Sequence, residues 1–490
     1  MQTTLLKSTD PLTARADLLV VPVPDPPTPL PPAAAAVDAA LGGVVAAAAA
    51  DGEVRGKPGE LALFHAGKAL AAPRVALVGI GKEGTADDWR TAGKAAARRA
   101  GQLKAVTVAV ALPEGAGPAE ARAFVEGVGA GDYRFDRFRK PPEDEARTRL
   151  ERLAVIAGSG IKAADLTRAD RTVAAVAAAR DLANTPANYL TPRGLAEHAQ
   201  ALADEIPGLD CEVLDESDLE QLRAGAILGV ARGSDEPPRM IVLRYTPKRP
   251  ARKGELLGLV GKAVTFDSGG ISIKPSGGME EMKMDMGGGA AVIEGTGLIA
   301  RLGLPVSVLA VIPATENMPS GHAIKPGDVL TAMNGKTIEV INTDAEGRLI
   351  LADALYYTAR QGATRMLDLA TLTGAIVVAL GEVYAGLFGS DSDWTEEVRL
   401  AGEASGDLAW PMPMHPGYDS LIRSKVADLA NAAKKRQAGP VYAAQFLREF
   451  TDGKPWCHLD VAGTAMIDGQ GSGYGVRLIA ALADRLSTRV

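Results

Sequence analysis

The sequence predicts an α/β protein with a smaller N-terminal α/β domain and a larger C-terminal domain, whose central, mostly parallel sheet is covered by helices. The chain has 490 residues, more than one hydrophobic core usually organises. Short runs rich in β-branched residues and leucine alternate with helical patterns along the chain. A polar segment at residues 134–149 separates two such series. We therefore expect domains at residues 1–165 and 166–490.

The first domain is expected to combine short buried strands with alanine-rich helices. Strands are predicted at residues 17–23, 74–80 and 106–112, and a helix at residues 88–103. The alanine-rich residues 33–50 contain Asp38 and two glycines and have little apolar mass, so a packed or surface helix is expected there and not a membrane span. A helix at residues 168–183 follows the polar segment and opens the second domain.

The second domain repeats the strand-then-helix pattern. Its strands are predicted at residues 256–260, 306–312, 338–341, 366–369 and 458–461, and its helices at residues 288–302 and 348–361. Functional groups of such sheets gather at the carboxyl ends of the strands. Charged segments follow Val260 and Ile341, and a threonine-rich one follows Leu369, so a site is expected at that edge.

Composition narrows the class of function. A net charge of −7 provides no electrostatic footprint for nucleic acid, so nucleic acid is not expected as a partner. Cys211 and Cys457 are far apart and belong to no CxxC motif, which is typical of a reducing compartment. The N-terminal segment carries charges and prolines where a secretory signal needs an apolar run. We expect a cytoplasmic protein without a membrane anchor.

One motif resembles a dinucleotide-binding fingerprint, but it is weak evidence for such a site. Residues 79–84 follow a predicted strand and fit GxGxxG, but such glycines are commonly only a tight turn, and Lys82 and Glu83 do not help a pyrophosphate approach. No bound nucleotide cofactor is therefore expected. The chain has no GxSxG, HExxH or Walker lysine motif, and its five histidines are too scattered for a common zinc site.

The strongest signals are charged residues among buried strand ends. Within residues 260–287, Lys262, Lys274, Asp267 and Asp285 stand in an apolar, glycine-rich context, and residues 341–349 read INTDAEGRL. Buried charges are costly unless they are paired or bound to metal, so a site explains both segments better than a solvated surface. Asp344 and Glu346, two residues apart, are expected to point the same way from an extended chain. A capped turn is the alternative for either segment alone.

These two segments resemble the signature regions of the leucyl aminopeptidases of the cytosol aminopeptidase family, and NTDAEGRL is that family's most specific string. The similarity continues in DLANTPANYLTP at 181–192, GVARGSDEPPR at 229–239, DLATLTGA at 368–375 and HLDVAGTA at 458–465. Two departures are Ala263, where the family usually has glycine, and a glycine within residues 287–289, where alanine or serine is common.

The resemblance implies a dinuclear-metal peptidase that removes residues from peptides with a free N-terminus. It implies that two divalent ions, Mn or Zn, are bound by Lys262, Asp267, Asp285, Asp344 and Glu346. Asp267 and Glu346 would bridge the two ions. Lys262 could act as a ligand only when deprotonated, so metal affinity should rise with pH.

The resemblance also assigns two catalytic residues and a set of lining residues. Lys274 would stabilise the oxyanion, and Arg348 would hold a bicarbonate ion that acts as general base. The substrate-binding residues implied are Met282, Asn342, Thr371, Leu372 and Gly374. For these five, plain packing is an equally good explanation. The resemblance further points to a homohexamer.

Two other classes of function remain as alternatives. A DNA-binding regulatory protein on the same fold would have to use the basic clusters at residues 244–253 and 434–436, against an acidic total. A silent relative that keeps the fold would have lost ligands, yet all seven ligand and catalytic positions are filled.

Overall fold

The computed structural model describes residues 1–6, 10–140, 148–157, 160–435 and 437–488. Residues 141–147 of the polar segment and Arg436 of the second basic cluster lie outside these described residues. The chain divides into two compact units, Met1–Ala177 and Ala178–Val490. The division falls within helix α5 (Ala163–Asn184), which begins five residues before the helix predicted at residues 168–183.

The first unit is built on a six-stranded sheet with the order β1-β6-β5-β2-β4-β3. The strands are β1 (Gln2–Leu5), β2 (Leu18–Val23), β3 (Leu61–His65), β4 (Arg74–Gly79), β5 (Thr107–Ala111) and β6 (Arg152–Ile156). Strand β3 runs antiparallel to β4, and the pairings from β1 through β4 are parallel. The three strands and the helix predicted from the sequence are confirmed as β2, β4, β5 and α3 (Ala86–Gln102).

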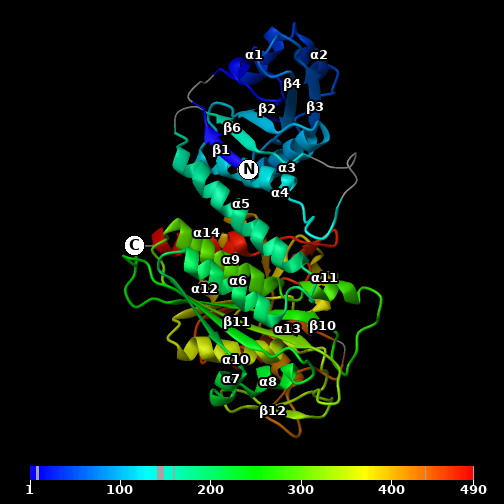
Figure 1. The fold of residues 1–490 in the computed structure, drawn as a ribbon, viewed down its shortest axis with the longest axis vertical. Helices are drawn as coiled ribbons and strands as arrows, with labels where there is room; N and C mark the ends of the chain where they lie inside the picture. Colours follow the sequence, from blue (N-terminus) through cyan, green and yellow to red (C-terminus); the bar gives the residue numbers. More distant parts are fainter. Residues whose placement is uncertain (7–9, 141–147, 158–159, 436, 489–490) are drawn as a thin grey trace. The chain divides into compact units, whose positions relative to one another are not determined.

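Helices cover both faces of this sheet, as the fully buried strand β2 requires. Leu18 and Val20 face the core beneath α3 and α4 (Pro118–Asp132), whereas Leu19, Val21 and Val23 face the opposite core with α1 (Pro32–Ala40) and α2 (Val44–Ala50). Figure 1 shows these two helix pairs on opposite sides of the strands.

The alanine-rich stretch forms two helices and not one. Helix α1 ends before Gly42 and Gly43, which adopt positive φ angles of 75° and 88°, and α2 begins directly after them. Glycine reaches this left-handed region without the penalty that a side chain would bring. Among the described helices, none alone is long and apolar enough to cross a membrane; α1 and α2 pass that test only together, bent by 117°.

The second unit is built on a nine-stranded sheet with the order β16-β15-β18-β14-β9-β11-β8-β7, with β10 added to β11. Its strands are β7 (Leu209–Leu214), β8 (Arg239–Tyr245), β9 (Leu257–Gly261), β10 (Ala263–Asp267), β11 (Val308–Asn317), β14 (Arg365–Ala370), β15 (Ala385–Gly389), β16 (Ala409–Pro411) and β18 (Trp456–Asp460). The central strands β18, β14, β9 and β11 are parallel, and antiparallel pairings lie toward the edges. The predicted mostly parallel sheet is confirmed in this centre.

Helices lie on both faces of this second sheet as well. One core joins the sheet to α8 (Gly225–Ala231), α10 (Gly347–Arg360) and α13 (Gly439–Arg448). On the other side lie α6 (Pro192–Glu205), α9 (Gly287–Leu302), α12 (Ser392–Ser405) and α14 (Val476–Thr488), and Figure 1 shows α9 and α10 on opposite sides of β11. Smaller elements are α7 (Glu216–Gln221), α11 (Gly374–Leu380) and the 3-10 helices η2 (Met279–Met284) and η3 (Pro416–Ile422).

One predicted strand was assigned to the wrong sheet. Residues 338–341 were expected in the central sheet, but β13 (Thr337–Glu339) belongs to a separate three-stranded sheet with β12 (Val329–Thr331) and β17 (Leu429–Ala430). A short apolar run reads the same in either sheet, because periodicity does not identify a strand's partners. The segment after β13 therefore reaches the central strand ends as a loop.

Candidate functional site

The carboxyl ends of neighbouring parallel strands bring the predicted residues to one edge of the central sheet. Lys262 directly follows β9, Asp267 ends β10, and Thr371 directly follows β14. The register places Gly261 beside Leu369 on the adjoining strands, and the backbone N–H of Lys262 donates to the carbonyl of Leu369 at 3.0 Å. The sheet thus fixes where each side chain leaves the backbone.

Lys262 is the centre of a buried charge network. Its Nζ lies 2.7 Å from Asp285 and 2.9 Å from Oε1 of Glu346, and it donates to the carbonyl of Thr371 at 2.9 Å. The Thr371 hydroxyl in turn donates to Asp285 at 2.6 Å. All four residues are buried. Partners surround Lys262 on three sides, so its position is tightly determined.

Gly347 makes room for this lysine. A Cβ on Gly347 would lie 2.5 Å from Cε and 2.7 Å from Nζ of Lys262, closer than side-chain atoms tolerate. Glycine at the first position of α10 is therefore what allows the Lys262 side chain to reach Glu346, the N-cap residue of that helix.

Lys274 forms a second charge group beside the first. Its Nζ lies 2.7 Å from Oδ2 of Asp267 and also contacts Asp344. Asn317, at the end of β11, donates from Nδ2 to Asp267 at 2.8 Å and to the carbonyl of Thr343 at 3.0 Å. Asn317 therefore joins the strand that carries Asp267 to the loop that carries Asp344. A polar residue at a strand end is the only sign of this role in the sequence.

The carboxylates of Asp344 and Glu346 converge through a turn and not through an extended chain, so that part of the sequence interpretation was wrong. The N–H of Ala345 donates to the carbonyl of Asn342, and Glu346 has helical angles (φ −73°, ψ −35°) as it enters α10. A turn followed by a helix start is favoured here because the Asn342 side chain accepts from the N–H of Asp344 at 3.0 Å.

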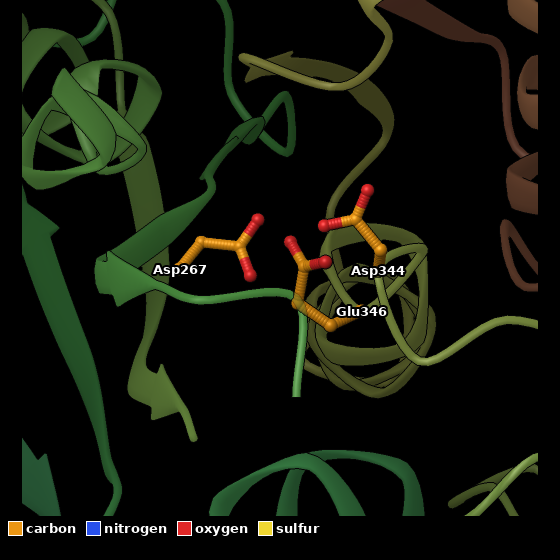
Figure 2. Close-up of side chains that lie close together, drawn as sticks. All are labelled: Asp267, Asp344 and Glu346. Atoms are coloured by element: carbon orange, nitrogen blue, oxygen red, sulfur yellow. The ribbon is translucent and has the colours of Figure 1, made fainter. Parts of the chain in front are cut away.

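Asp267, Asp344 and Glu346 can offer carboxylate oxygens that all lie within 4.8 Å of one another. Figure 2 shows the three carboxylates close together, Asp267 at the end of a strand and Asp344 and Glu346 at the loop that leads into a helix. With Asp285 they make four acidic groups against two lysines, a deficit of positive charge in a buried place. Oε2 of Glu346 is also buried, and no described residue gives it a hydrogen-bond partner. Divalent cations fit this donor set, because they would supply both the missing positive charge and a partner for the carboxylate oxygens.

The crowding of charge shifts the pKa values of the group. Burial, together with the Glu346 charge, raises the pKa of Asp267 to about 6 despite Lys262 and Lys274. Burial raises the pKa of Asp285 well above its usual range. Burial also raises the pKa of Asp344. Burial acts the same way on Glu346, but the two lysines outweigh it and lower the pKa.

The two lysines shift in the direction that keeps them charged. Burial would lower the pKa of Lys262, but the carboxylates of Asp285, Glu346 and Asp267 outweigh it and raise the pKa. The carboxylates of Asp267 and Asp344 raise the pKa of Lys274 in the same way. Protons and metal ions therefore compete for these carboxylates, and a rise in pH favours the metal.

The charge network lines a cavity of about 430 Å³, large enough for a peptide terminus. All seven predicted ligand and catalytic residues line it, and so do Met282, Thr371, Leu372 and Gly374. Asn342 differs: within the described part of the chain it is not among the lining residues, and its side chain holds the turn before Asp344. Further lining residues that the sequence interpretation missed are Glu281, Thr373, Val377, Glu382, Ala462, Gly463 and Met466.

Arg348 lies in the wall of this cavity, in the first turn of α10. Its Nη1 donates to the carbonyl of Asn431 at 2.7 Å, and its guanidinium lies 5.1 Å from the ring centroid of Tyr442. The Nε atom is buried, and no described residue gives it a hydrogen-bond partner. The side chain is thus fixed in place with one donor not used within the described part of the chain.

The two departures from the resembled pattern meet in space. A Cβ on Gly289 would lie 2.8 Å from the Cβ of Ala263 and 3.0 Å from the carbonyl oxygen of Lys262. The methyl group of Ala263 therefore occupies the room that a side chain at position 289 would need. The pair keeps the packing between β10 and α9 without displacing the neighbouring Lys262.

Comparison with family models gives a match over nearly the whole chain. Residues 177–480 match the catalytic domain of the cytosol aminopeptidase family, and residues 20–142 match its N-terminal domain.

Curated relatives of similar length agree with this match. A protein of Solibacter usitatus named "Probable cytosol aminopeptidase" is 47% identical over 423 residues, which cover 86% of this chain and 87% of the relative. A protein of Alkaliphilus oremlandii with the same name is 41% identical over 460 residues, covering 90% and 91%.

Solved structures extend the similarity to three dimensions. A mutant of the tomato leucine aminopeptidase is 36% identical with a TM-score of 0.87, covering 96% of this chain and 94% of that one. The bottromycin maturation enzyme BotP in complex with Mn is 34% identical with a TM-score of 0.85, covering 96% and 100%.

Proposed function

Because this chain belongs to the cytosol aminopeptidase family, a family of metal-dependent aminopeptidases, we propose that its cavity removes single residues from the free N-termini of peptides by metal-assisted hydrolysis. The observation that carries the proposal is the cluster of Asp267, Asp344 and Glu346, two of them buried, whose carboxylates converge without enough positive charge to balance them. The Mn complex of BotP supports divalent metal as the missing partner.

Five residues would hold two divalent ions, Mn or Zn, in this cluster. Asp267, Asp285, Asp344 and Glu346 would contribute carboxylate oxygens to the ions, and Lys262 would contribute its amine. Such a pair of ions lowers the pKa of a shared water and polarises the scissile carbonyl. Lys262 must release its proton to bind metal, and its raised pKa makes that release the costly step of loading.

Lys274 would serve the reaction by its charge. The carboxylates around it raise its pKa, so the ammonium group persists at neutral pH, and it is about one-fifth exposed toward the cavity. A fixed cation beside the reacting carbonyl stabilises the negative charge that develops on its oxygen.

Arg348 would hold a bicarbonate ion. The contacts to Asn431 and Tyr442 fix the guanidinium, and its unpartnered Nε supports an additional acceptor. The bound anion would accept the proton of the attacking water as general base. The free α-amine of the substrate would bind beside the metal cluster, which explains why cleavage would be confined to the first residue.

We further propose a homohexamer in the cytoplasm. Large apolar side chains at the surface of the second unit support contacts between subunits: Val378 on α11 is 90% exposed, and Val383 and Trp410 are 63% and 55% exposed. Sedimentation of the purified chain would test this stoichiometry.

Metal removal is the decisive test of the function. We expect exhaustive chelation to abolish cleavage of aminoacyl chromogenic amides, and Mn or Zn to restore it in a panel that also contains Co and Mg. Full turnover by protein shown to be metal-free would refute the two-metal assignment. The same panel would rank the preferred N-terminal residue.

Acetylation of the substrate α-amine separates an aminopeptidase from an endopeptidase. We expect acetylated peptides to remain uncleaved, while the free peptides of the same sequence are shortened one residue at a time in a mass-spectrometric time course. Efficient cleavage of the acetylated set would show that the amine is not part of recognition.

A further inference from the structure

Asp460 is a buried carboxylate behind the cavity for which the proposed reaction has no use. It is the last residue of β18, beside β14 in the sheet, and the register pairs it with Ala370. Its side chain is completely buried. A carboxylate in such a place is costly unless several donors satisfy it, so its contacts indicate what it is kept for.

The side-chain hydrogen bonds of Asp460 reach two loops that line the cavity. Oδ1 accepts from the backbone N–H groups of Leu372 at 3.1 Å, Thr373 at 3.3 Å and Ala462 at 3.3 Å. Oδ2 accepts from the hydroxyl of Thr373 at 2.6 Å. One side chain thus holds the loop after β14 and the loop after β18 at the same time.

These two loops form walls of the cavity. Leu372, Thr373 and Gly374 line it from one loop, and Ala462 and Gly463 line it from the other. The second loop is packed closely: a Cβ on Gly463 would lie 2.1 Å from the carbonyl oxygen of Gly381, at the end of α11. Neither wall can move far while Asp460 holds both.

The first loop also continues into the charge network. Thr371, the residue before Leu372, donates its hydroxyl to Asp285 and accepts from Lys262 through its carbonyl. A shift of Leu372 and Thr373 would therefore reach two of the proposed metal ligands through one peptide unit. The wall and the charge network are connected at this point.

We propose that Asp460 is a positioning residue, which clamps the two loops so that the substrate wall and the charge network keep a fixed spacing. The inference rests on the proposed aminopeptidase function but concerns a residue that does not touch substrate or metal. Placing reactive groups within about 1 Å of their productive positions is worth roughly 100-fold in rate.

The identity of the clamping atoms sets the choice of variants. Asn at position 460 keeps an oxygen for the three backbone N–H groups, and its amide can donate to the Thr373 hydroxyl, which then accepts. Ala keeps none of the four contacts. Thr373→Val removes only the hydroxyl contact. A positioning role thus predicts that Asp460→Asn keeps the loop positions and the activity that Asp460→Ala loses.

Asp407 provides the matched control. It is also buried, and its Oδ2 accepts from the backbone N–H groups of Gly475 at 3.0 Å and Leu478 at 3.3 Å, at the start of α14. It does not line the cavity in the described part of the chain. Asp407 also pairs with Arg477, so Asp407→Ala removes a buried clamp that includes an ion pair from a place outside the cavity lining.

The experiment compares kinetics and backbone exchange of the Mn-loaded full-length proteins. We expect Asp460→Ala to reduce kcat/KM about 100-fold, with KM rising more than kcat falls, and Asp460→Asn and Thr373→Val to stay within about 10-fold of the parent. Amide hydrogen exchange at residues 371–374 and 462–464 should accelerate in Asp460→Ala and not in Asp460→Asn. Asp407→Ala should change neither kcat/KM nor exchange in these loops.

The outcomes separate this inference from the function on which it rests. Absence of metal-dependent turnover in the parent protein would refute the proposed function, whereas the exchange measurement would still report on the clamp. Normal kcat/KM and unchanged loop exchange in Asp460→Ala would overturn the inference alone. An equal loss in Asp460→Asn would also overturn it, since charge and not position would then be the requirement. If Asp460→Ala does not fold, Thr373→Val decides, because it removes one of the clamping contacts. Exchange at residues 371–374 should accelerate in Thr373→Val and not in Asp460→Asn, and unchanged exchange in Thr373→Val would overturn the inference.

Discussion

The two units of the chain share an architecture and use it for different purposes. In both, helices cover a sheet with a parallel centre, and a charged or glycine-rich turn follows a central strand. In the first unit the turn after β4 brings glycines against backbone: a Cβ on Gly79 would lie 2.0 Å from the carbonyl oxygen of Lys57. In the second unit the segments after β9 and β10 bring buried charges against one another.

The difference shows that glycine after a strand does not by itself make a site. The N–H of Gly81 donates to the carbonyl of Gly56 at 2.9 Å, and the start of α3 is capped by Thr85 and Asp88, so the polar groups that a phosphate would need are already bonded within the chain. At the carboxyl ends of the strands in the second sheet, by contrast, Oε2 of Glu346 and Nε of Arg348 are buried and have no hydrogen-bond partner among the described residues. Buried charged groups with unused hydrogen-bonding capacity therefore mark the functional edge of the sheet.

Among the changes at the functional edge, Glu346→Ala should cause the largest loss of metal binding and activity. Metal content should fall below two ions per chain and turnover should fall more than about 100-fold, because even residues that only orient a metal ligand contribute up to that factor. The fold should largely survive, since its cores do not depend on metal. Elemental analysis, circular dichroism and peptide turnover on one preparation measure all three.

Glu280→Ala is the control for that change. Glu280 is exposed on η2 and lies outside the cavity lining. Its loss should leave metal content and turnover unchanged. A folded Glu346→Ala protein with two metals per chain and full activity would contradict the ligand assignment.

Lys274→Ala should separate charge stabilisation from metal binding within the same edge. The kcat value should drop by about 100-fold, as for other donors to a developing oxyanion, while metal content should not fall. Removing this ammonium frees Asp267 and Asp344 from a competing cation, so metal affinity should be equal or higher. Lys283→Ala, a nearby change outside the cavity lining, should have little effect on kcat. Parallel loss of metal and activity in Lys274→Ala would indicate that Lys274 acts as a ligand.

The sequence predicted much of this edge because its residues lie in short segments that directly follow strands. Lys262 directly precedes a five-residue strand and Asp267 ends it, and their neighbours in space follow from parallel pairing. The path of residues 341–346 could not be predicted in the same way. Whether β13 joins the central sheet depends on tertiary contacts with β17, which local periodicity does not encode.

Residues that orient others were the ones that sequence reasoning missed. Asn317 and Asp460 carry no sign of function in isolation, since a polar residue ending a strand is common. Their importance comes from hydrogen bonds to residues 26 and 87 to 88 positions away, which only the fold reveals. Asn342, in turn, was predicted as a lining residue and instead holds the turn before Asp344.

Gly79→Ala, at the end of β4 in the first unit, should lower the stability of the fold without changing catalysis. A methyl group 2.0 Å from a carbonyl oxygen forces the backbone of residues 56–57 to shift, and such overpacking costs about 1–3 kcal/mol. The denaturant midpoint should fall, with turnover per folded molecule unchanged. Gly101→Ala, inside α3, where the Cβ would make only an ordinary contact at 3.5 Å with Nη2 of Arg134, should be neutral or stabilising. Loss of turnover in a fully folded Gly79→Ala protein would show that the glycine-rich turn has a catalytic role after all.

Asp353 tests whether buried charge in the second unit marks function even away from the cavity. Its carboxylate is completely buried in α10 and accepts from the N–H groups of Ala226, Ile227 and Met333. Burial outweighs these three bonds and raises the pKa of Asp353 to about 7. The bonds connect structural elements, so the carboxylate should influence stability and not catalysis.

The direction of the pH effect follows from this raised pKa. Because the folded chain holds the Asp353 proton more tightly than the unfolded chain, stability is lost as pH rises, until the carboxyl is ionised in both states above pH 7. Between pH 6 and 8 the loss should be about 1.4 kcal/mol, one pKa unit of linkage. Asp353→Asn cannot ionise, so its free energy of unfolding should approach or overtake that of the parent over this range, as measured by urea titration at each pH. A parent protein that instead gains stability over Asp353→Asn as pH rises would show that the three N–H donors hold the carboxylate ionised. Turnover per folded molecule should be unchanged in Asp353→Asn, because buried charged groups take part in catalysis only where they line the cavity.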